Sequence, residues 1–206
     1  RYLLGALSDF DKKEIIDYSD MPEIEKWVLN EVYKLSKKII QFTQNYQLGD
    51  IYREVYDFCN DDLSSFYFDI RKDTLYCSSY DSVERRSCRT VLDILFNCIC
   101  TWLAPILCFT TEEAWKTQNV DENESVHLKE YFKPNDVWNN DTLSKKWGVI
   151  RNLRLKVTNK IEEKRREGLI GSSLEALIDL EVPTDYFKIV SNLNLSEIFI
   201  CSKVEF

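Results

Sequence analysis

Glycine, proline, methionine and histidine are all scarce in this sequence. The 206 residues include five Gly, four Pro, one Met and one His. So few turn-forming residues exclude a collagen-like chain and Pro/Gly-rich disorder, and they favour long helices over many tight turns. The single histidine, His127, leaves no zinc-ligand spacing, and it would be the only base for Ser-His or Cys-His catalysis.

Long apolar runs and an excess of positive charge are missing as well. The most apolar stretch, residues 91–109, contains Asp93 and Pro105 and is too polar to span a membrane. Lys and Arg number 27 against 35 Asp and Glu, a net charge of −8, so the chain as a whole is not a basic nucleic-acid binder. The sequence starts at Arg1 without Met or a signal-peptide layout, and we expect a piece of a longer polypeptide.

The seven cysteines do not form a metal-binding pattern. None of them lies in a Cys-x-x-Cys motif, and the nearest pair is Cys98 and Cys100. We therefore expect no metal site, and reduced, mostly buried thiols in a cytoplasmic protein.

Helical periodicity dominates the first two thirds of the chain. Asp20 before Met21-Pro22 predicts the cap of a long amphipathic helix that ends near Gly49, and a second helix follows from Ile51 to Ile70. Asp81 with Glu84 resembles a capping box and predicts a third, central helix with a wide apolar face.

Further signals complete the helical part. Pro105 kinks or ends the third helix, and Thr110-Thr111-Glu112-Glu113 predicts the start of a short helix through Trp115. Residues 118–141 form a polar connection, and the last long helix runs from Asp141 to Glu167, where Gly168 stops it.

After Gly168 the apolar period changes from helical to alternating. Residues 176–182 predict a strand, Thr184 the cap of a short helix, and residues 198–204 a second strand, which implies a parallel pair. The predicted fold is mainly α, a bundle of about five helices with a small C-terminal α/β appendage. The predicted domains are a connector over residues 1–18, a helical domain over 19–170 and an α/β segment over 171–206.

The segment from Arg151 to Arg166 is strongly basic. It holds seven Lys or Arg against two Glu, a net charge of +5, which leaves 20 basic and 33 acidic residues, −13, in the rest of the chain. Such asymmetry indicates a local anion-binding surface, although an ordinary charged helix face is an equal alternative. The candidate contact residues for an anionic partner are Arg151, Arg154, Lys156, Lys160, Lys164 and Arg165.

Arg154 differs from the other candidates in its position on the helix. It falls within the apolar stripe formed by residues such as Leu153, Val157 and Ile161, so it must pair with a buried carboxylate or reach over the edge to a ligand. Lys156 and Lys160 lie to one side of this stripe, where they could face phosphates.

No catalytic site emerges from the residues. There is no Gly-rich phosphate loop, and adjacent helix positions such as Asp61 and Asp62 point about 100° apart and do not share a site. A structural role for His127 is the simpler interpretation, because no partner geometry marks it as a base. Most aromatic residues lie on core stripes, which favours packing over base stacking.

Several segments together resemble isoleucyl-tRNA synthetase, a class I aminoacyl-tRNA synthetase. They are Arg1–Gly5, Leu63–Asp73, Leu103–Leu107 followed by Thr111–Trp115, Glu124–Leu128, and Gly168–Ala176 directly after the basic helix. The matches keep the family's order and cover nearly the whole chain. The stretch Gly-Ser-Ser-Leu-Glu-Ala favours the isoleucyl enzyme over its valyl and leucyl relatives.

The resemblance implies a helical anticodon-binding domain that holds the anticodon stem-loop of tRNA-Ile, followed by the start of the C-terminal region. Neither ATP motif of the family occurs here, so the chain itself should need no cofactor and perform no catalysis, while the parent ligase uses ATP. The expected partners are tRNA-Ile and the other domains of the same polypeptide, in a monomer without a membrane segment. Arg154 and Arg165 match arginines in the family's last bundle helix.

The sequence also departs from the family pattern. Thr74 stands where an arginine commonly follows Lys-Asp, and the C-terminal zinc-binding cysteine cluster of many members is missing. Two other functions stay open from the residues alone. One is a helical protein-interaction module with an exposed apolar patch, and the other is a small hydrolase that uses His127.

Overall fold

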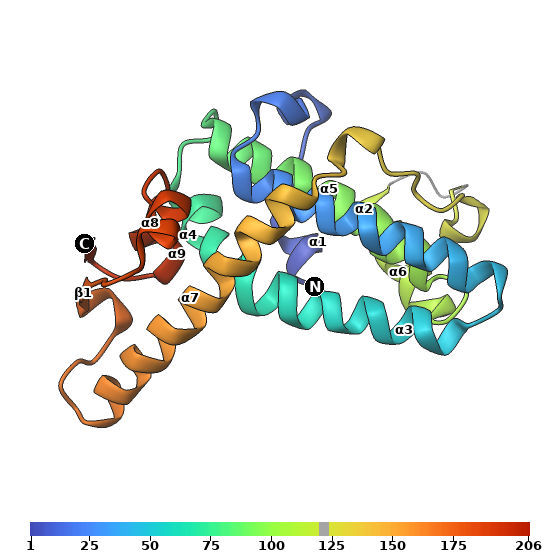
Figure 1. Cartoon of the computed structure of the whole chain (residues 1–206). Helices are drawn as coiled ribbons and strands as arrows, with labels where there is room; N and C mark the ends of the chain where they lie inside the picture. Colours follow the sequence, from blue (N-terminus) through green and yellow to red (C-terminus); the bar gives the residue numbers. More distant parts are fainter. Residues whose placement is uncertain (120–123) are drawn as a thin grey trace. The chain divides into compact units, whose positions relative to one another are not determined.

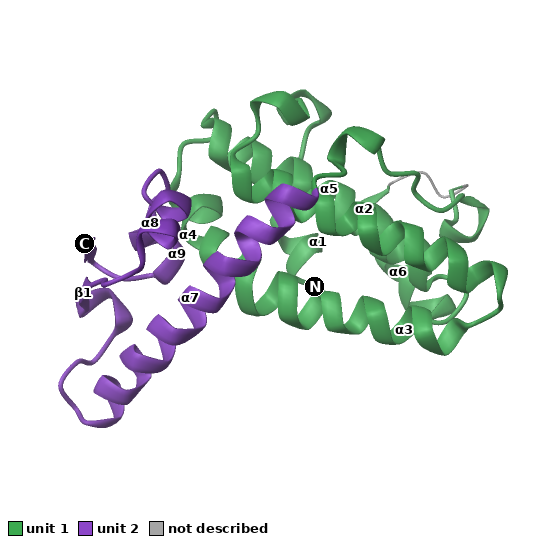
Figure 2. Cartoon of the chain, viewed as in Figure 1, with its two compact units in different colours: residues 1–140 green, residues 141–206 purple. Residues whose placement is uncertain are grey.

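The structure is a computed structural model that describes residues 1–119 and 124–206. The chain forms two compact units, Arg1–Asn140 (unit 1) and Asp141–Phe206 (unit 2), coloured separately in Figure 2. Unit 1 is helical, and unit 2 combines helices with a small sheet (Figure 1). The predicted fold class, mainly helical with a small C-terminal α/β part, is confirmed. The division differs from the predicted boundary after residue 170, because the last long helix is grouped with the C-terminal segment.

Unit 1 begins with the short helix α1 (Tyr2–Ala6) and two 3₁₀ turns, followed by the long helix α2 (Glu23–Gln44). The predicted cap at Asp20 is wrong, because Pro22 precedes the first helical residue and no side chain caps the helix. The predicted end near Gly49 is also too late. Tyr46 takes a positive φ of 55° after the helix, and Gly49 lies in the first turn of the next one.

The second predicted helix is a continuous run of three segments. They are α3 (Leu48–Asp57), the π-helical segment η3 (Phe58–Tyr67) and α4 (Phe68–Cys77). Phe58 and Leu63 are both buried and five positions apart, a spacing that the wider π turn keeps on one face. The hydroxyl of Ser64 donates to the carbonyl of Cys59 across one such turn, at 2.7 Å.

Helix α5 (Val83–Leu103) is the centre of unit 1, as predicted, and contacts α1, α2, α3, α4 and α6. Figure 1 shows it beside α2. The predicted capping residue Asp81 is wrong. Instead the hydroxyl of Ser82 accepts the hydrogen bond from the main-chain N–H of Arg85, at 3.3 Å.

Helix α6 (Cys108–Gln118) begins two residues before the predicted Thr110, after Pro105 has ended α5. Thr110 therefore lies inside the helix, and no side chain caps its start. The carboxylate of Glu112 instead accepts hydrogen bonds from the hydroxyl of Ser125 and the main-chain N–H of Val126. The polar connection holds 3₁₀ turns at Val126–Leu128 and Asp136–Trp138, and its residues 120–123 lie outside the described part of the chain.

A buried ion pair joins two helices of unit 1. Arg71 on α4 donates two hydrogen bonds of 2.7 Å to the carboxylate of Glu25 on α2, and the hydroxyl of Tyr67 donates a third at 3.1 Å. Glu25 is fully buried, and this burial raises the pKa of its carboxyl group against the opposing effect of Arg71.

Unit 2 consists of α7 (Asp141–Arg166), β1 (Leu177–Asp179), α8 (Thr184–Val190), α9 (Leu195–Phe199) and β2 (Lys203–Glu205). Gly168 follows α7 with φ of 74°, as expected for a glycine that ends a helix. The predicted parallel pair is confirmed, with Leu177 opposite Lys203. The second strand is shorter than predicted because Leu195–Phe199 is helical. Thr184 is the first helical residue and does not cap α8 with its side chain.

Candidate nucleic-acid interface

Helix α7 buries one stripe of side chains along its length. The buried residues are Leu143, Trp147, Ile150, Leu153, Arg154, Val157 and Ile161. Apart from the adjacent Leu153 and Arg154, they recur every three or four positions, so the periodic stripe predicted from the sequence is confirmed. The stripe fixes which side chains of the basic segment can face solvent.

Arg154 is the exception among the six candidate residues, because it lies inside the stripe and is only 8% exposed. Its Nε donates to the main-chain carbonyl of Ile198 at 2.7 Å. Ile198 lies in the last turn of α9, where carbonyls lack partners within the helix, and a cation there also meets the negative end of the helix dipole. This contact with a main-chain carbonyl is one that the sequence did not suggest.

Lys156, Lys160 and Lys164 lie together on one side of the stripe. They are four positions apart, so they follow one another along α7 with a rise of about 6 Å per step. All three residues are exposed, and the side chains of Lys160 and Lys164 are 76% and 53% accessible. The geometry therefore gives a linear row of three ammonium groups, which we call the lysine row.

Intrahelical ion pairs partly screen this charge. Lys160 lies 2.7 Å from Glu163, and Lys164 lies 2.7 Å from Glu167. The hydrogen bond from Lys160 lowers the pKa of Glu163, and the same bond raises the pKa of Lys160. Pairs this exposed contribute little and exchange readily, so the lysines can turn to a stronger anion such as a phosphate.

The other two candidates lie away from the lysine row. By helical geometry Arg151 and Arg165 point to the opposite side of the buried stripe. Arg165 is exposed and pairs with Glu162 at 2.6 Å, while Arg151 is half-buried. The structure thus brings three of the six candidates together in one row and places the remaining three elsewhere on the helix.

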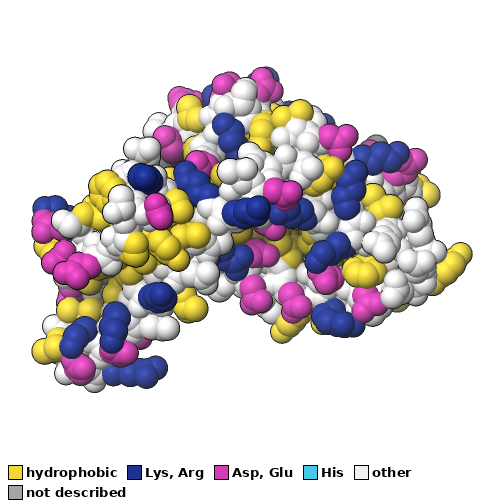
Figure 3. All heavy atoms as spheres, in the orientation of Figure 1, with side chains coloured by type: hydrophobic (Ala, Val, Ile, Leu, Met, Phe, Trp, Pro, Cys, Tyr) yellow, Lys and Arg dark blue, Asp and Glu magenta, His cyan; other side chains and the backbone are white. Residues whose placement is uncertain are grey.

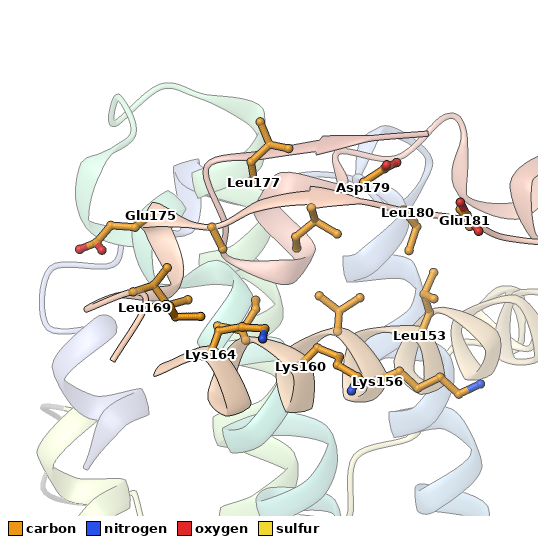
Figure 4. Close-up of a pocket in the computed structure, with 15 residues that line it drawn as sticks. Leu153, Lys156, Lys160, Lys164, Leu169, Glu175, Leu177, Asp179, Leu180 and Glu181 are labelled. Atoms are coloured by element: carbon orange, nitrogen blue, oxygen red, sulfur yellow. The ribbon is translucent and has the colours of Figure 1, made fainter. Parts of the chain in front are cut away.

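A groove runs between the lysine row and the strand β1, and we call it the α7–β1 groove. Its volume is about 540 Å³. Leu153, Val157 and Ile161 line it from α7, and residues 175–181 line it from the other side (Figure 4). Sequence reasoning found the lysines but not this opposite wall. The signal available in the sequence was Gly168, which ends α7. After this residue the chain reverses direction, and β1 runs back along the helix.

Charges of both signs and apolar side chains surround the groove. Lys156, Lys160 and Lys164 project from α7, whereas Asp179 and Glu181 belong to the strand side (Figure 4). Leu169 and Leu177 line the groove and are themselves 67% and 60% exposed. On the face drawn in Figure 3, Lys and Arg side chains lie among acidic and hydrophobic ones over the C-terminal part of α7.

Unit 1 offers weaker candidates for a functional site. The Nε2 of His127 lies 3.2 Å from the carbonyl oxygen of Cys108, a contact that fits the structural role expected for this histidine. All seven cysteines are free thiols, and four of them are buried. In residues 1–119 and 124–206 no three metal-ligating side chains gather, and none of the helices there is long and apolar enough to cross a membrane.

A row of lysines beside an open groove is an arrangement that could hold an anionic partner. Residues 25–182 match the family described as the anticodon-binding domain of tRNA ligase. Since this match covers most of the sequence, the chain belongs to that family.

Curated relatives support the assignment. The chain is 42% identical over 205 residues to an isoleucine–tRNA ligase of Gluconobacter oxydans, covering all of this chain and 21% of the relative. Isoleucine–tRNA ligases of Zymomonas mobilis and Agrobacterium fabrum are each 44% identical, over 99% of this chain and 22% and 21% of their own lengths. The resemblance to isoleucyl-tRNA synthetases is thus confirmed, and the chain spans about a fifth of these relatives.

Proposed function

We propose that this chain binds the anticodon stem-loop of tRNA-Ile as part of an isoleucine–tRNA ligase. The parent enzyme would attach isoleucine to tRNA-Ile with ATP, and this region would contribute RNA binding without a catalytic group or cofactor of its own. Its partners would be tRNA-Ile and the other domains of the same polypeptide, in a cytoplasmic monomer. The observation that carries the proposal is the lysine row on α7 in a chain of the anticodon-binding family.

The charge distribution supports a local RNA contact on an acidic domain. The segment from Arg151 to Arg166 carries +5, and the rest of the chain carries −13, from 20 basic and 33 acidic residues. An acidic remainder repels RNA elsewhere and directs it to the basic helix. Phosphate contacts of this kind position the nucleic acid and make its affinity salt-dependent.

The six candidate residues divide into two roles. The lysine row and Arg165 are exposed and can contact phosphates from opposite sides of the buried stripe, and Arg151 is half-buried on the same side as Arg165. Arg154 would position α7 against α9 through its bond to Ile198 instead of touching RNA. Contacts from polar and aromatic side chains to unstacked loop bases would add the anticodon preference.

The direct test is a binding titration with anticodon stem-loops. One RNA carries the isoleucine anticodon, a second differs from it only in the anticodon, and a third comes from another tRNA. We expect the isoleucine stem-loop to bind most tightly. We also expect the triple variant Lys156→Ala/Lys160→Ala/Lys164→Ala to weaken every RNA, because it removes phosphate contacts that all of them share.

The matched control removes three exposed lysines from unit 1, with the triple variant Lys13→Ala/Lys72→Ala/Lys133→Ala. It changes the net charge equally and should leave the RNA affinity near that of the wild type. Equal affinity for all three RNAs would reduce the proposal to nonspecific electrostatics. If no RNA bound at low salt, the proposal would fail for this chain, and a protein-interaction module would be the better description.

A further inference from the structure

We propose that Arg85 and Arg89 on α5 form a binding site for a phosphate group, and that the segment over residues 8–20 closes this site with the carboxylate of Glu14. We call this segment the strap. The site belongs to unit 1, depends on contacts within that unit and is independent of the RNA proposal.

The strap is attached to unit 1 without burying any of its own side chains. Leu7 before it and Met21 after it are buried, whereas every residue from 8 to 20 is exposed or half-buried. Figure 1 shows this segment as the blue loop at the top of the view. Few buried apolar contacts are typical of segments that open locally while the rest of a domain stays folded.

Polar contacts with α5 hold the main chain of the strap. The guanidinium of Arg86 donates to the carbonyls of Lys13 and Glu14, both at 3.2 Å. The N–H of Ile16 donates to the hydroxyl of Thr90, also at 3.2 Å. These three bonds place the strap over one face of α5, and all of them can be replaced by water when the strap lifts.

The strap covers a buried arginine pair on α5. Arg89 is 1% exposed, and its Nη2 lies 2.6 Å from a carboxylate oxygen of Asp9. Its Nη1 lies 3.0 Å from Oε2 of Glu14, and the Phe10 ring centroid lies 5.4 Å from its guanidinium carbon. Arg85, one turn earlier, is 8% exposed, and its Nη1 lies 3.9 Å from the same oxygen of Glu14.

The carboxylate of Glu14 matches these two arginines poorly. Its Oε1 accepts a hydrogen bond from the main-chain N–H of Asp11 at 3.2 Å, in a capping box within the strap. In the part of the chain that the structure describes, its Oε2 accepts no hydrogen bond, and Nη1 of Arg85 and Nε of Arg89 are buried without an acceptor. Buried donors left unpaired cost free energy, which favours an anion that satisfies them.

A phosphate group suits this arginine pair better than a carboxylate does. It carries a charge of about −1.5 to −2 at pH 7 and has more acceptor oxygens than a carboxylate. Arg85 and Arg89 are four positions apart, so they lie on one face of α5, and guanidinium groups bind phosphate bidentately. A partner's carboxylates would offer no more than Glu14 already does. Glu14 is therefore an internal substitute for the ligand, and phosphate binding requires the strap to lift.

The test follows hydrogen exchange of the strap in the presence of inorganic pyrophosphate. It uses the whole chain with Lys156→Ala/Lys160→Ala/Lys164→Ala, so that pyrophosphate cannot bind the lysine row instead. The N–H of Ile16 reports closure directly, because it donates to Thr90 on α5. At ten times the dissociation constant of pyrophosphate for the open form, exchange should quicken about tenfold. Sodium chloride of equal ionic strength should have much less effect.

Two strap variants separate Glu14 from the general charge of the strap. Glu14→Gln removes the competing charge and keeps an acceptor for the capping box. It should quicken exchange without pyrophosphate and tighten pyrophosphate binding in calorimetry, each about tenfold, because apparent affinity follows the open fraction. The control Asp17→Asn makes the same charge change at an exposed residue whose side chain caps no helix. It should leave both quantities near those of the parent chain.

Arg89→Gln tests the site itself. It removes donors that the phosphate needs, so pyrophosphate should no longer change the exchange of the strap, while circular dichroism shows that the helices are retained. A response to pyrophosphate that persists in this variant would place the phosphate elsewhere and overturn the proposal. If Arg89→Gln does not fold, the opposite shifts expected for Glu14→Gln and Asp17→Asn still decide the question.

An RNA oligonucleotide at equal phosphate concentration identifies the source of the phosphate. Opening by both ligands would support a site that also accepts nucleic-acid phosphates, and opening by pyrophosphate alone would support a site for free phosphates. Equal opening by sodium chloride would show charge screening without a site. No opening by pyrophosphate, with either glutamate or glutamine at position 14, would leave the arginines as a structural clamp. Either of the last two results would overturn the proposal.

Discussion

The buried arginines of unit 1 and the exposed lysines on α7 of unit 2 show two different uses of a basic side chain. In unit 1, Arg71 and Arg89 are 5% and 1% exposed, and each is paired with carboxylates. In unit 2, Lys156, Lys160 and Lys164 are exposed along α7, and Lys160 and Lys164 pair with the nearby Glu163 and Glu167. A count of Lys and Arg therefore says little about function until burial is known.

Arg154 combines features of both groups of basic residues. It belongs to the basic helix of unit 2, yet it is as buried as the arginines of unit 1 and donates to a main-chain carbonyl. A guanidinium suits such positions because its planar donors stay charged and can bond in a fixed direction, whereas a flexible, strongly hydrated lysine ammonium suits a surface. Residue type and burial together separate structural basic groups from those that are exposed to a ligand.

The largest expected effect is on the buried pair of unit 1. Arg71→Ala leaves Glu25 buried without its main counter-charge, and we expect the free energy of unfolding to fall by about 3–5 kcal/mol. Its neighbour Lys72 forms an exposed pair with Asp69, so Lys72→Ala should cost about 0–1 kcal/mol. Urea unfolding followed by circular dichroism measures both. Similar midpoints for the two variants would contradict the structural role of Arg71.

The next effect concerns Arg154. Arg154→Met keeps the aliphatic length but leaves the carbonyl of Ile198 without this donor, and the expected cost is about 1–3 kcal/mol. The control Arg165→Met changes an exposed pair and should cost under about 1 kcal/mol. Hydrogen exchange at α9 should quicken only in the first variant. A loss of RNA affinity without faster exchange would instead show that Arg154 touches RNA.

The smallest expected changes in stability come from two glycine substitutions, one within α7 and one just after it. Gly168 has φ of 74°, and Gly168→Ala should destabilise unit 2 by about 1 kcal/mol. Gly148 lies within the helix, and a Cβ there would meet nothing within 4 Å. Gly148→Ala should therefore stabilise by about 0.5–1 kcal/mol. Thermal unfolding curves should shift in opposite directions, and shifts of the same sign would contradict the assigned helix end.

Much of this fold could be predicted because it depends on local patterns. The buried stripe of α7, the stop at Gly168 and the parallel strand pair follow from period and glycine placement. Helix starts were less predictable, because several polar residues compete for a cap. Ser82 caps α5 where Asp81 was expected, and Pro22 precedes α2 in place of a capping side chain.

The features that could not be predicted depend on contacts between residues that are far apart in the sequence. The bond of Arg154 to Ile198 spans 44 positions, and no local pattern specifies a main-chain carbonyl as its partner. The wall of the α7–β1 groove forms only when the chain folds back after Gly168. The π-helical segment Phe58–Tyr67 was not predictable, because Val55, Cys59 and Leu63 keep an ordinary four-residue helical spacing through it.

The measurement that tests the central claim most directly is the salt dependence of RNA binding. The affinity for the isoleucine anticodon stem-loop is determined across a series of salt concentrations for the wild type, the triple variant of the lysine row and the control triple variant of unit 1. Each lost phosphate contact reduces the slope of log affinity against log salt by about 0.7–0.9, so the lysine-row variant should lose about two to three units of slope. The control should keep the slope of the wild type. Equal slopes for the two variants would show that the lysine row does not contact the RNA.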